Sequence, residues 1–303
     1  MLPPAPGPHL CNSAPLCSNP AVTALRTLAG VACLLATAEA LAQSSPSQAL
    51  QRALAGTHAS ATVVRVADGH VLASYGPQSI LAAPGSTLKP FVLDAALKGR
   101  VINTVATIHC DGHLVIQGHN LACTHPRDIV MLDAQEALAN SCNTYFATIA
   151  RRMSAANLRE GLRSYGFDPT QRNLQLDHPD NRALLALGVE GIRTSPLQLA
   201  LAYRKLALAL PLASPIRAGL LQSVQAGMAH AAYIPGLKLA GKTGTVDDPG
   251  GRSHGWFAGI VYSGEPASAL PSTVLAIYLP SGNGNDAAGL ARQYFLQHPE
   301  PAP

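Results

Sequence analysis

Residues 239–246, LAGKTGTV, predict the strand on which the fold class of this chain depends. A Gly/Asp/Pro loop follows at 247–251, and the ranges 255–262 and 273–278 are then rich in Val, Ile and aromatic residues. Such segments, separated by turn residues, are typical of β-strands. We therefore expect neighbouring strands of one sheet here, closed by a helix over 285–296.

Outward from this block, the chain predicts a hairpin and then a run of helices. Residues 59–74, ASATVVRVADGHVLAS, hold two β-branched runs around an Asp-Gly pair, which is a hairpin signal. Hairpin, helices, strands and a last helix, in that order, fit an α+β (mixed α/β) fold: an antiparallel sheet flanked by helices, with a helical lobe. Helices are expected over 45–56, 86–98, 133–152 (broken at 140–143), 156–165 and 195–208, with irregular chain over 100–127 and a polar loop over 167–182.

Composition excludes some classes of function. The chain has 303 residues, of which 48% are hydrophobic and 13% charged, so it can bury a substantial core. The net charge is +4, and no dense Lys/Arg cluster is present. We therefore expect no nucleic-acid partner.

The N-terminus predicts export. Arg26 precedes the apolar run 27–42, TLAGVACLLATAEALA, which ends in an A-x-A pattern. This run is shorter than the ~20 residues of a membrane-spanning helix and contains Glu39. We expect 1–42 to be a signal peptide, with an uncleaved membrane anchor as the alternative. Residues 43–57 are then a short helical linker, and 58–298 form the main domain, in the periplasm or cell envelope.

Six cysteines raise the question of disulfides and metals. In an oxidising compartment Cys110 and Cys123 could form a disulfide and leave Cys142 free. Nearby histidines make a metal site conceivable, but the spacing C-x2-H-x5-H-x3-C-x-H matches no common zinc pattern. A disulfide or unpaired thiols are expected rather than a metal. The other cysteines, in or before the signal, are Cys11, Cys17 and Cys33, and the histidines are His113, His119 and His125.

The first motif that could carry chemistry is S-x-x-K, formed by Ser86 and Lys89. On a helix these positions share a face, so the amine can approach the hydroxyl. A serine hydroxyl needs a base to become a nucleophile, and a lysine can be that base when burial or nearby cations lower its pKa. Alone, the motif is also an ordinary helix start.

Two further motifs are weak when each is taken alone. Ser141-Cys142-Asn143 interrupts two apolar helical stretches, where a turn is expected. Its hydroxyl could relay a proton and its amide could bind a substrate amide. In the stretch 242–245, KTGT, the lysine and the hydroxyls of Thr243 and Thr245 could bind a carboxylate, while Gly244 leaves room for substrate along the strand.

Together, in this order, the three motifs resemble those of penicillin-binding proteins and serine β-lactamases. The resemblance to a penicillin-binding transpeptidase domain extends over 58–296. It includes the flanking segments PGSTLKPF at 84–91, ALANSCNTYF at 137–146, TSPLQ at 194–198 and WFAG at 256–259.

This resemblance implies a serine acyl-enzyme without a metal or organic cofactor. Ser86 would attack the D-Ala–D-Ala end of a peptidoglycan stem peptide, with Lys89 as base and β-lactams as covalent inhibitors or substrates. Ser141 would shuttle a proton with Lys242, and Asn143 would hold the substrate backbone. Thr243 and Thr245 would bind the terminal carboxylate beside Gly244, and the backbone N–H groups of Ser86 and Thr245 would form the oxyanion hole.

Alternatives remain open from sequence. A β-lactamase needs a base that activates water, and Asp177 with Asn181 offers one candidate pair, although an ordinary polar loop explains both residues. A catalytically silent binding or sensor-like module is a second alternative, disfavoured by the intact motifs. Transpeptidase and carboxypeptidase differ only in the acceptor. The short leader before the first strand favours a minimal, free-standing catalytic domain.

Overall fold

The computed structural model of the chain describes residues 44–169, 174–248, 250–264 and 269–298. The predicted signal peptide, with Cys11, Cys17 and Cys33, lies outside these residues. Within them, no helix combines the length and the apolar character needed to cross a membrane.

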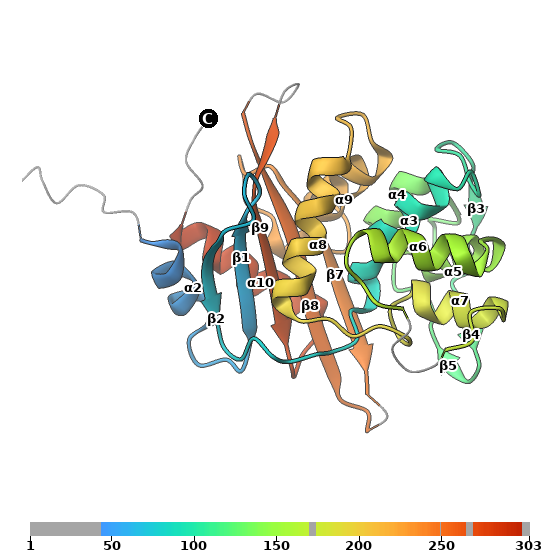
Figure 1. Cartoon of the computed structure of the whole chain (residues 1–303), viewed down its shortest axis with the longest axis horizontal. Coiled ribbons are helices and arrows are strands. Elements are labelled where there is room, and N and C mark those ends of the chain that lie inside the picture. Colours follow the sequence, from blue (N-terminus) through green and yellow to red (C-terminus); the bar gives the residue numbers. More distant parts are fainter. Residues whose placement is uncertain (1–43, 170–173, 249, 265–268, 299–303) are drawn as a thin grey trace, which may run out of the picture. The chain divides into compact units, whose positions relative to one another are not determined.

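One five-stranded antiparallel sheet organises the domain, in the order β2-β1-β9-β8-β7 (Figure 1). The predicted N-terminal hairpin and the predicted C-terminal strands are both confirmed, and β1 lies between β2 and β9. Segments far apart in sequence therefore form one sheet, with β7 at its edge. The strands are β1 (Ser60–Arg65), β2 (Val71–Tyr75), β7 (Leu239–Asp247), β8 (Ser253–Ser263) and β9 (Leu270–Leu279).

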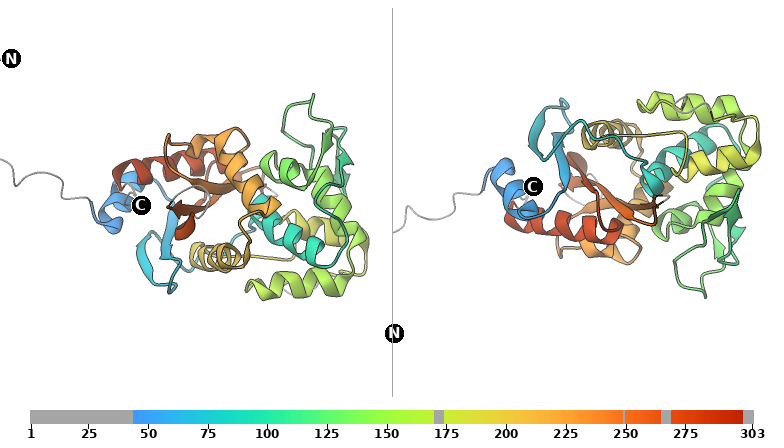
Figure 2. Two further views of the ribbon diagram at one scale, coloured as in Figure 1. Left: turned by 90° about the horizontal axis from the view of Figure 1, so that it is seen from above. Right: turned by 90° about the horizontal axis from the view of Figure 1, so that it is seen from below.

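Helices cover both faces of this sheet. Side chains alternate along a strand, and in β8 Trp256 and Ala258 face one hydrophobic core while Phe257 and Val261 face another. Helix α8 (Pro196–Ala209) packs over the first core, and α10 (Gly284–Gln297) with α2 (Pro46–Leu54) packs over the second. Figure 2 shows α8 and α10 on opposite sides of the strands.

The helical lobe lies beside the β7 edge of the sheet (Figure 1). Its helices are α3 (Lys89–Lys98), α4 (Ala134–Ala139), α5 (Asn143–Arg152), α6 (Ala155–Ser164) and α7 (Pro179–Ala186), and its short strands are β3 (Ile108–His109), β4 (Val115–Ile116), β5 (His119–Asn120) and β6 (Met131–Leu132). Helix α9 (Pro215–Gln225) contacts both α4 and β7. The expected mixed fold with a helical lobe is therefore confirmed.

Two helices of the structure were not expected from the sequence. Helix α7 begins inside the range expected to be a polar loop, and α9 was not predicted. Both start with a proline in the first turn behind a capping side chain, His178 for α7 and Ser214 for α9. The Ser-Pro pair at 214–215 was therefore a readable start signal, of the kind that correctly located α8 at Ser195.

Helix α2, expected to belong to a linker, packs as part of the domain. A reciprocal capping box of Ser45 and Gln48 begins it. Leu50 and Leu54 are fully buried in the core that α10 also lines. The Nδ1 atom of His298 lies 2.7 Å from the Ser44 carbonyl oxygen, so the first and last described residues are neighbours.

Candidate active site

Ser86 lies in a tight turn that the sheet holds in place. The 3-10 helix η1 (Gly85–Leu88) carries it directly into α3. The Trp256 indole N–H donates to the Ala83 carbonyl at 2.9 Å, and Gly85, at φ +55°, donates its N–H to the Gly188 carbonyl at 3.0 Å. Only glycine adopts this φ without strain. The Ser86 side chain is left partly exposed on a rigid support.

Two buried lysines from different elements converge on one hydroxyl. Lys89 Nζ donates to Ser141 Oγ at 3.2 Å, and Lys242 Nζ, from β7, donates to the same oxygen at 2.8 Å. Lys89 also donates to the Ser141 carbonyl at 2.8 Å and to Asn143 Oδ1 at 2.5 Å. At least one predicted residue from each of the three motifs is thus brought together, with Lys89 and Lys242 both at Ser141. Among the described residues, the Lys89 amine bonds to this second motif rather than to Ser86.

Ser141 occupies a strained backbone position. Its φ is +53°, in the left-handed region that non-glycine residues avoid. It lies at the break between α4 and α5, where Asn140 ends one helix and Cys142 caps the next. Strained residues of this kind cost of order 1–3 kcal/mol and cluster at functional sites. In this conformation the Ser141 hydroxyl accepts hydrogen bonds from both amines.

The edge strand β7 supplies the remaining predicted residues. Thr243 is nearly buried, with its hydroxyl 3.3 Å from the Met228 carbonyl oxygen. Thr245 is exposed, and its Oγ1 accepts a hydrogen bond from the N–H of Gly284, in the first turn of α10, at 2.9 Å. At Gly244 a Cβ would lie 2.6 Å from the Pro84 carbonyl oxygen. Glycine is therefore needed here for close packing of β7 against the turn that carries Ser86.

Burial controls the charge of both amines. Loss of solvation lowers the pKa of Lys89 to about 8, and the thiols of Cys123 and Cys142 partly oppose this shift. Burial, together with the positive charge of Lys89, holds the pKa of Lys242 well below its usual range. A neutral amine beside the site is therefore available near neutral pH, as a general base requires.

If Lys89 is the base for acylation of Ser86, as the family resemblance implies, its lowered pKa sets how the rate of that step depends on pH. A base must be unprotonated, so the rate of acylation by penicillin should rise with pH through about 8 and then level off. At pH 6 the neutral fraction is about a hundredth, and the rate should fall by roughly that factor. Rates measured at constant ionic strength from pH 6 to 10 test this. A flat profile from 7 to 9 would show that Lys89 is not the base.

Comparison with known proteins now identifies the family. The model of the penicillin binding protein transpeptidase domain matches residues 59–293. The chain belongs to this family. Penicillin-binding protein 3 of Bacillus subtilis (strain 168) is 28% identical over an alignment of 235 positions, and the match covers 59% of this chain and 34% of that protein. The chain therefore spans about a third of the length of this curated relative.

Solved structures of penicillin-binding proteins share the fold. The D,D-transpeptidase domain of a peptidoglycan glycosyltransferase from Eggerthella lenta gives a TM-score of 0.70 at 22% identity, covering 84% of this chain and 80% of that chain. Pseudomonas aeruginosa PBP2 in complex with WCK 5153 gives 0.65 at 20%, covering 82% and 75%. The transpeptidase domain of Burkholderia pseudomallei penicillin-binding protein 3 gives 0.67 at 20%, covering 82% and 89%.

Asp177 and Asn181 were considered above as the pair that would activate water in a β-lactamase. Asp177 is exposed, and the side chain of Asn181 bonds to the Gln175 carbonyl and to Gln117. Neither makes a hydrogen bond to the motif residues among those the structure describes. This placement supports the interpretation of Asp177 and Asn181 as loop and helix-start residues.

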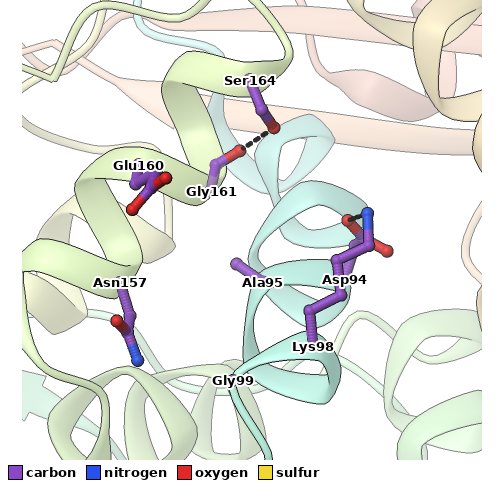
Figure 3. Close-up of a pocket in the computed structure, with 8 residues that line it drawn as sticks. All are labelled: Asp94, Ala95, Lys98, Gly99, Asn157, Glu160, Gly161 and Ser164. Carbon is purple, nitrogen blue, oxygen red and sulfur yellow. Dashed lines mark hydrogen bonds and ion pairs between the residues drawn. The ribbon is translucent and has the colours of Figure 1, made fainter.

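A pocket of about 320 Å³ between α3 and α6 lies apart from the three motifs (Figure 3). The Asp94 carboxylate there is already paired with the Lys98 amine at 2.7 Å and the Tyr165 hydroxyl at 2.6 Å. The Asp94 carboxylate therefore has little remaining capacity to accept hydrogen bonds from a ligand. The lining residues are Asp94, Ala95, Lys98, Gly99, Asn157, Glu160, Gly161 and Ser164.

The cysteines after the leader are free thiols in the structure. Cys110, Cys123 and Cys142 are all buried, and the Sγ atoms of Cys110 and Cys123 lie 3.5 Å apart, so the disulfide considered from sequence is not formed. His125 joins them, whereas His119 pairs with Glu190 at 3.0 Å. Spacing along the chain could not reveal this grouping, because Cys142 comes from the helix break that also carries Ser141.

Proposed function

We propose that this chain is a serine acyltransferase that acts on the D-Ala–D-Ala end of peptidoglycan stem peptides, as a DD-transpeptidase or DD-carboxypeptidase. The convergence of Lys89 and Lys242 on the Ser141 hydroxyl, next to the turn that carries Ser86, is the observation behind this proposal. Membership of the transpeptidase family supports it. Peptidoglycan is an envelope polymer, so the proposal also implies an exported protein, with a possible anchor through its N-terminus.

The first step forms the acyl-enzyme. Neutral Lys89 takes the proton of the Ser86 hydroxyl, directly or through Ser141, and the Ser86 oxygen attacks the carbonyl carbon of the penultimate D-Ala. The resulting oxyanion accepts hydrogen bonds from the backbone N–H groups of Ser86 and Thr245. Each such donor is worth about 3–4 kcal/mol in a hydrolase where one was removed.

The second step expels the terminal D-Ala. Its nitrogen receives a proton through Ser141, which both amines contact. The C–N bond then breaks and leaves the acyl group on Ser86. An acceptor amine completes transpeptidation, and water completes carboxypeptidation. In both cases the acceptor attacks the acyl carbon and the ester bond to Ser86 breaks. The proton that the acceptor gives up passes through the lysine–serine network to the Ser86 oxygen.

Substrate would lie along the exposed edge of β7. An extended peptide can add to such an edge through main-chain hydrogen bonds. The hydroxyl groups of Thr243 and Thr245 would bind the terminal carboxylate, and the buried Lys242 amine beside them would contribute N–H donors rather than a fixed positive charge. The side chain of Asn143, held by its own Nδ2–H bond to the Leu121 carbonyl at 2.9 Å, faces Lys89 and would hold the peptide backbone from the lobe side.

Adduct formation with a fluorescent penicillin tests this function. The full chain should gain one penicillin on Ser86, observed by intact mass and on a denaturing gel, and the adduct should persist for hours because a transpeptidase deacylates β-lactams slowly. Ser86→Ala should lose the label, whereas Ser164→Ala, which changes an exposed serine on α6, should keep it.

Two other results would contradict the proposal in different ways. A Ser86-dependent adduct that disappears within seconds while penicillin is consumed would identify a β-lactamase and direct attention to Asp177. A folded chain that forms no adduct would identify a catalytically silent member of the family.

A further inference from the structure

Three cysteine sulfurs and one imidazole nitrogen lie close together next to the second motif, which supplies one of the sulfurs. We call their residues the thiol–imidazole cluster. All four side chains are buried, and the ligand atoms lie within 4.8 Å of one another. The cluster consists of Cys110, Cys123, His125 and Cys142.

Three of the six distances between the ligand atoms are close to those of a tetrahedral zinc site, and all six are within 4.8 Å. Zn–S bonds of about 2.3 Å and Zn–N bonds of about 2.0–2.1 Å at tetrahedral angles place two sulfurs about 3.8 Å apart and a sulfur about 3.6 Å from a nitrogen. Here Cys110 Sγ lies 3.5 Å from Cys123 Sγ and 3.5 Å from His125 Nε2. The Sγ atoms of Cys123 and Cys142 are 3.7 Å apart. These separations exceed the ~2.05 Å of a disulfide bond.

The surrounding hydrogen bonds prepare these atoms as ligands. His125 Nδ1 lies 3.0 Å from the Pro126 carbonyl oxygen, so it carries the hydrogen and leaves the Nε2 lone pair directed at the sulfurs. The backbone N–H of Asn143 donates to Cys123 Sγ at 3.1 Å, and that of Tyr145 donates to Cys142 Sγ at 3.4 Å. N–H donors of this kind stabilise thiolates, the form that binds metal.

We propose that the thiol–imidazole cluster binds one Zn²⁺ ion as a closed structural site. Three cysteines and one histidine are a common structural zinc set, and sulfur-rich tetrahedral sites select zinc over harder ions such as Mg²⁺ or Ca²⁺. On binding, the three thiols release their protons and form three Zn–S bonds, while neutral His125 supplies the fourth ligand. The site has no open position, so the ion takes no part in acyl transfer.

The proposed ion would fix the geometry of the active site. Cys142 lies between Ser141 and Asn143, the residues that contact the Lys89 amine. Cys110 and Cys123 come from the irregular segment before β6, which has little regular structure of its own. Zinc would tie this segment to the strained turn at Ser141. The cluster residues would therefore be positioning residues rather than catalytic ones.

Metal analysis of the full chain tests the proposal directly. Protein purified under reducing conditions without chelator should contain about one zinc per chain. Cys142→Ser and His125→Gln should each weaken zinc binding at least about tenfold, since even loss of an outer hydrogen-bond partner costs 10–100-fold. His113→Gln, an exposed histidine in the same segment, is the matched control and should keep full zinc. Cobalt in place of zinc should show thiolate charge-transfer bands and the visible bands of a tetrahedral site.

The link to acyl transfer is tested by removing and restoring the ion. A strong chelator should slow penicillin labelling by about tenfold to a hundredfold, because small displacements of catalytic groups have effects of this size. Zinc, but not magnesium, should restore the rate.

Three results would overturn the zinc site. One is a folded, reduced chain that binds no zinc when zinc is supplied. Another is full zinc retention in both His125→Gln and Cys142→Ser. The third is a Cys110–Cys123 disulfide in protein isolated from the envelope without reductant. Metal content and cobalt spectra do not depend on penicillin, so the zinc proposal and the proposed acyltransferase can fail independently.

Discussion

Lys89→Met should lower the rate of penicillin acylation about a thousandfold while leaving the protein folded, since general base catalysis contributes 10²–10⁴-fold. Methionine is of similar length and fits a fully buried position, but it cannot accept the Ser86 proton. The second-order acylation rate, with the unfolding temperature as a check on folding, measures this effect.

The control for this substitution is on the same helix. Lys98 is at the other end of α3, with its side chain 65% exposed in an ion pair with Asp94, so Lys98→Met should acylate at the normal rate. Lys89→Arg distinguishes the role of Lys89 as a base from its role as a hydrogen-bond donor to Ser141 and Asn143. Arginine keeps donors and charge but does not deprotonate. Retention of more than a tenth of the rate by Lys89→Met would assign the base to another group.

Gly188→Ala should destabilise the domain and slow acylation together. An added Cβ would lie 2.2 Å from the Gly85 carbonyl oxygen, and the backbone at φ +70° disfavours any side chain. Strain and overpacking together should cost about 2–5 kcal/mol, or roughly 5–15 °C in Tm for a domain of this size. Thermal unfolding measures the first effect, and penicillin labelling below the transition measures the second.

Gly289→Ala is the matched control for this prediction. Gly289 lies in α10 with no atom within 4 Å of an added Cβ. Alanine is the better helix former, so this variant should be unchanged or up to about 1 kcal/mol more stable. An equal loss of stability in both variants would show that contact with Gly85 is not the cause.

Local signals in the sequence predicted much of the fold. Asp-Gly between β-branched runs located the β1–β2 hairpin, and Ser195-Pro196 located α8, because these residues act through backbone geometry close in sequence. The same rule, applied to Ser214-Pro215, would have found α9. No local signal indicates that β1 pairs with β9 rather than with a nearer segment, because long-range pairing depends on the packing of both faces.

The sequence motifs proposed the site residues, but they did not indicate which of these residues contact one another. The motifs identified Ser86, Lys89 and Lys242 by type and order. The structure adds that both lysines meet at Ser141, that this serine has a positive φ, and that a cysteine cluster lies behind it. The sequence predicted a turn between these helices, but the backbone conformation of that turn and the burial around it depend on tertiary packing, which spacing along the chain does not encode.

The pairing of β1 between β2 and β9 also has a consequence for the order in which the protein can assemble during synthesis. The β1–β2 hairpin is made early, yet its second edge has no partner until β9 has been made. An unpaired edge is open to association with other chains. Lys242 likewise arrives on β7 long after Ser86 has emerged from the ribosome. A nascent chain that has not reached Leu279 therefore carries the proposed nucleophile without a complete sheet, and the proposed active site is completed among the last events of folding.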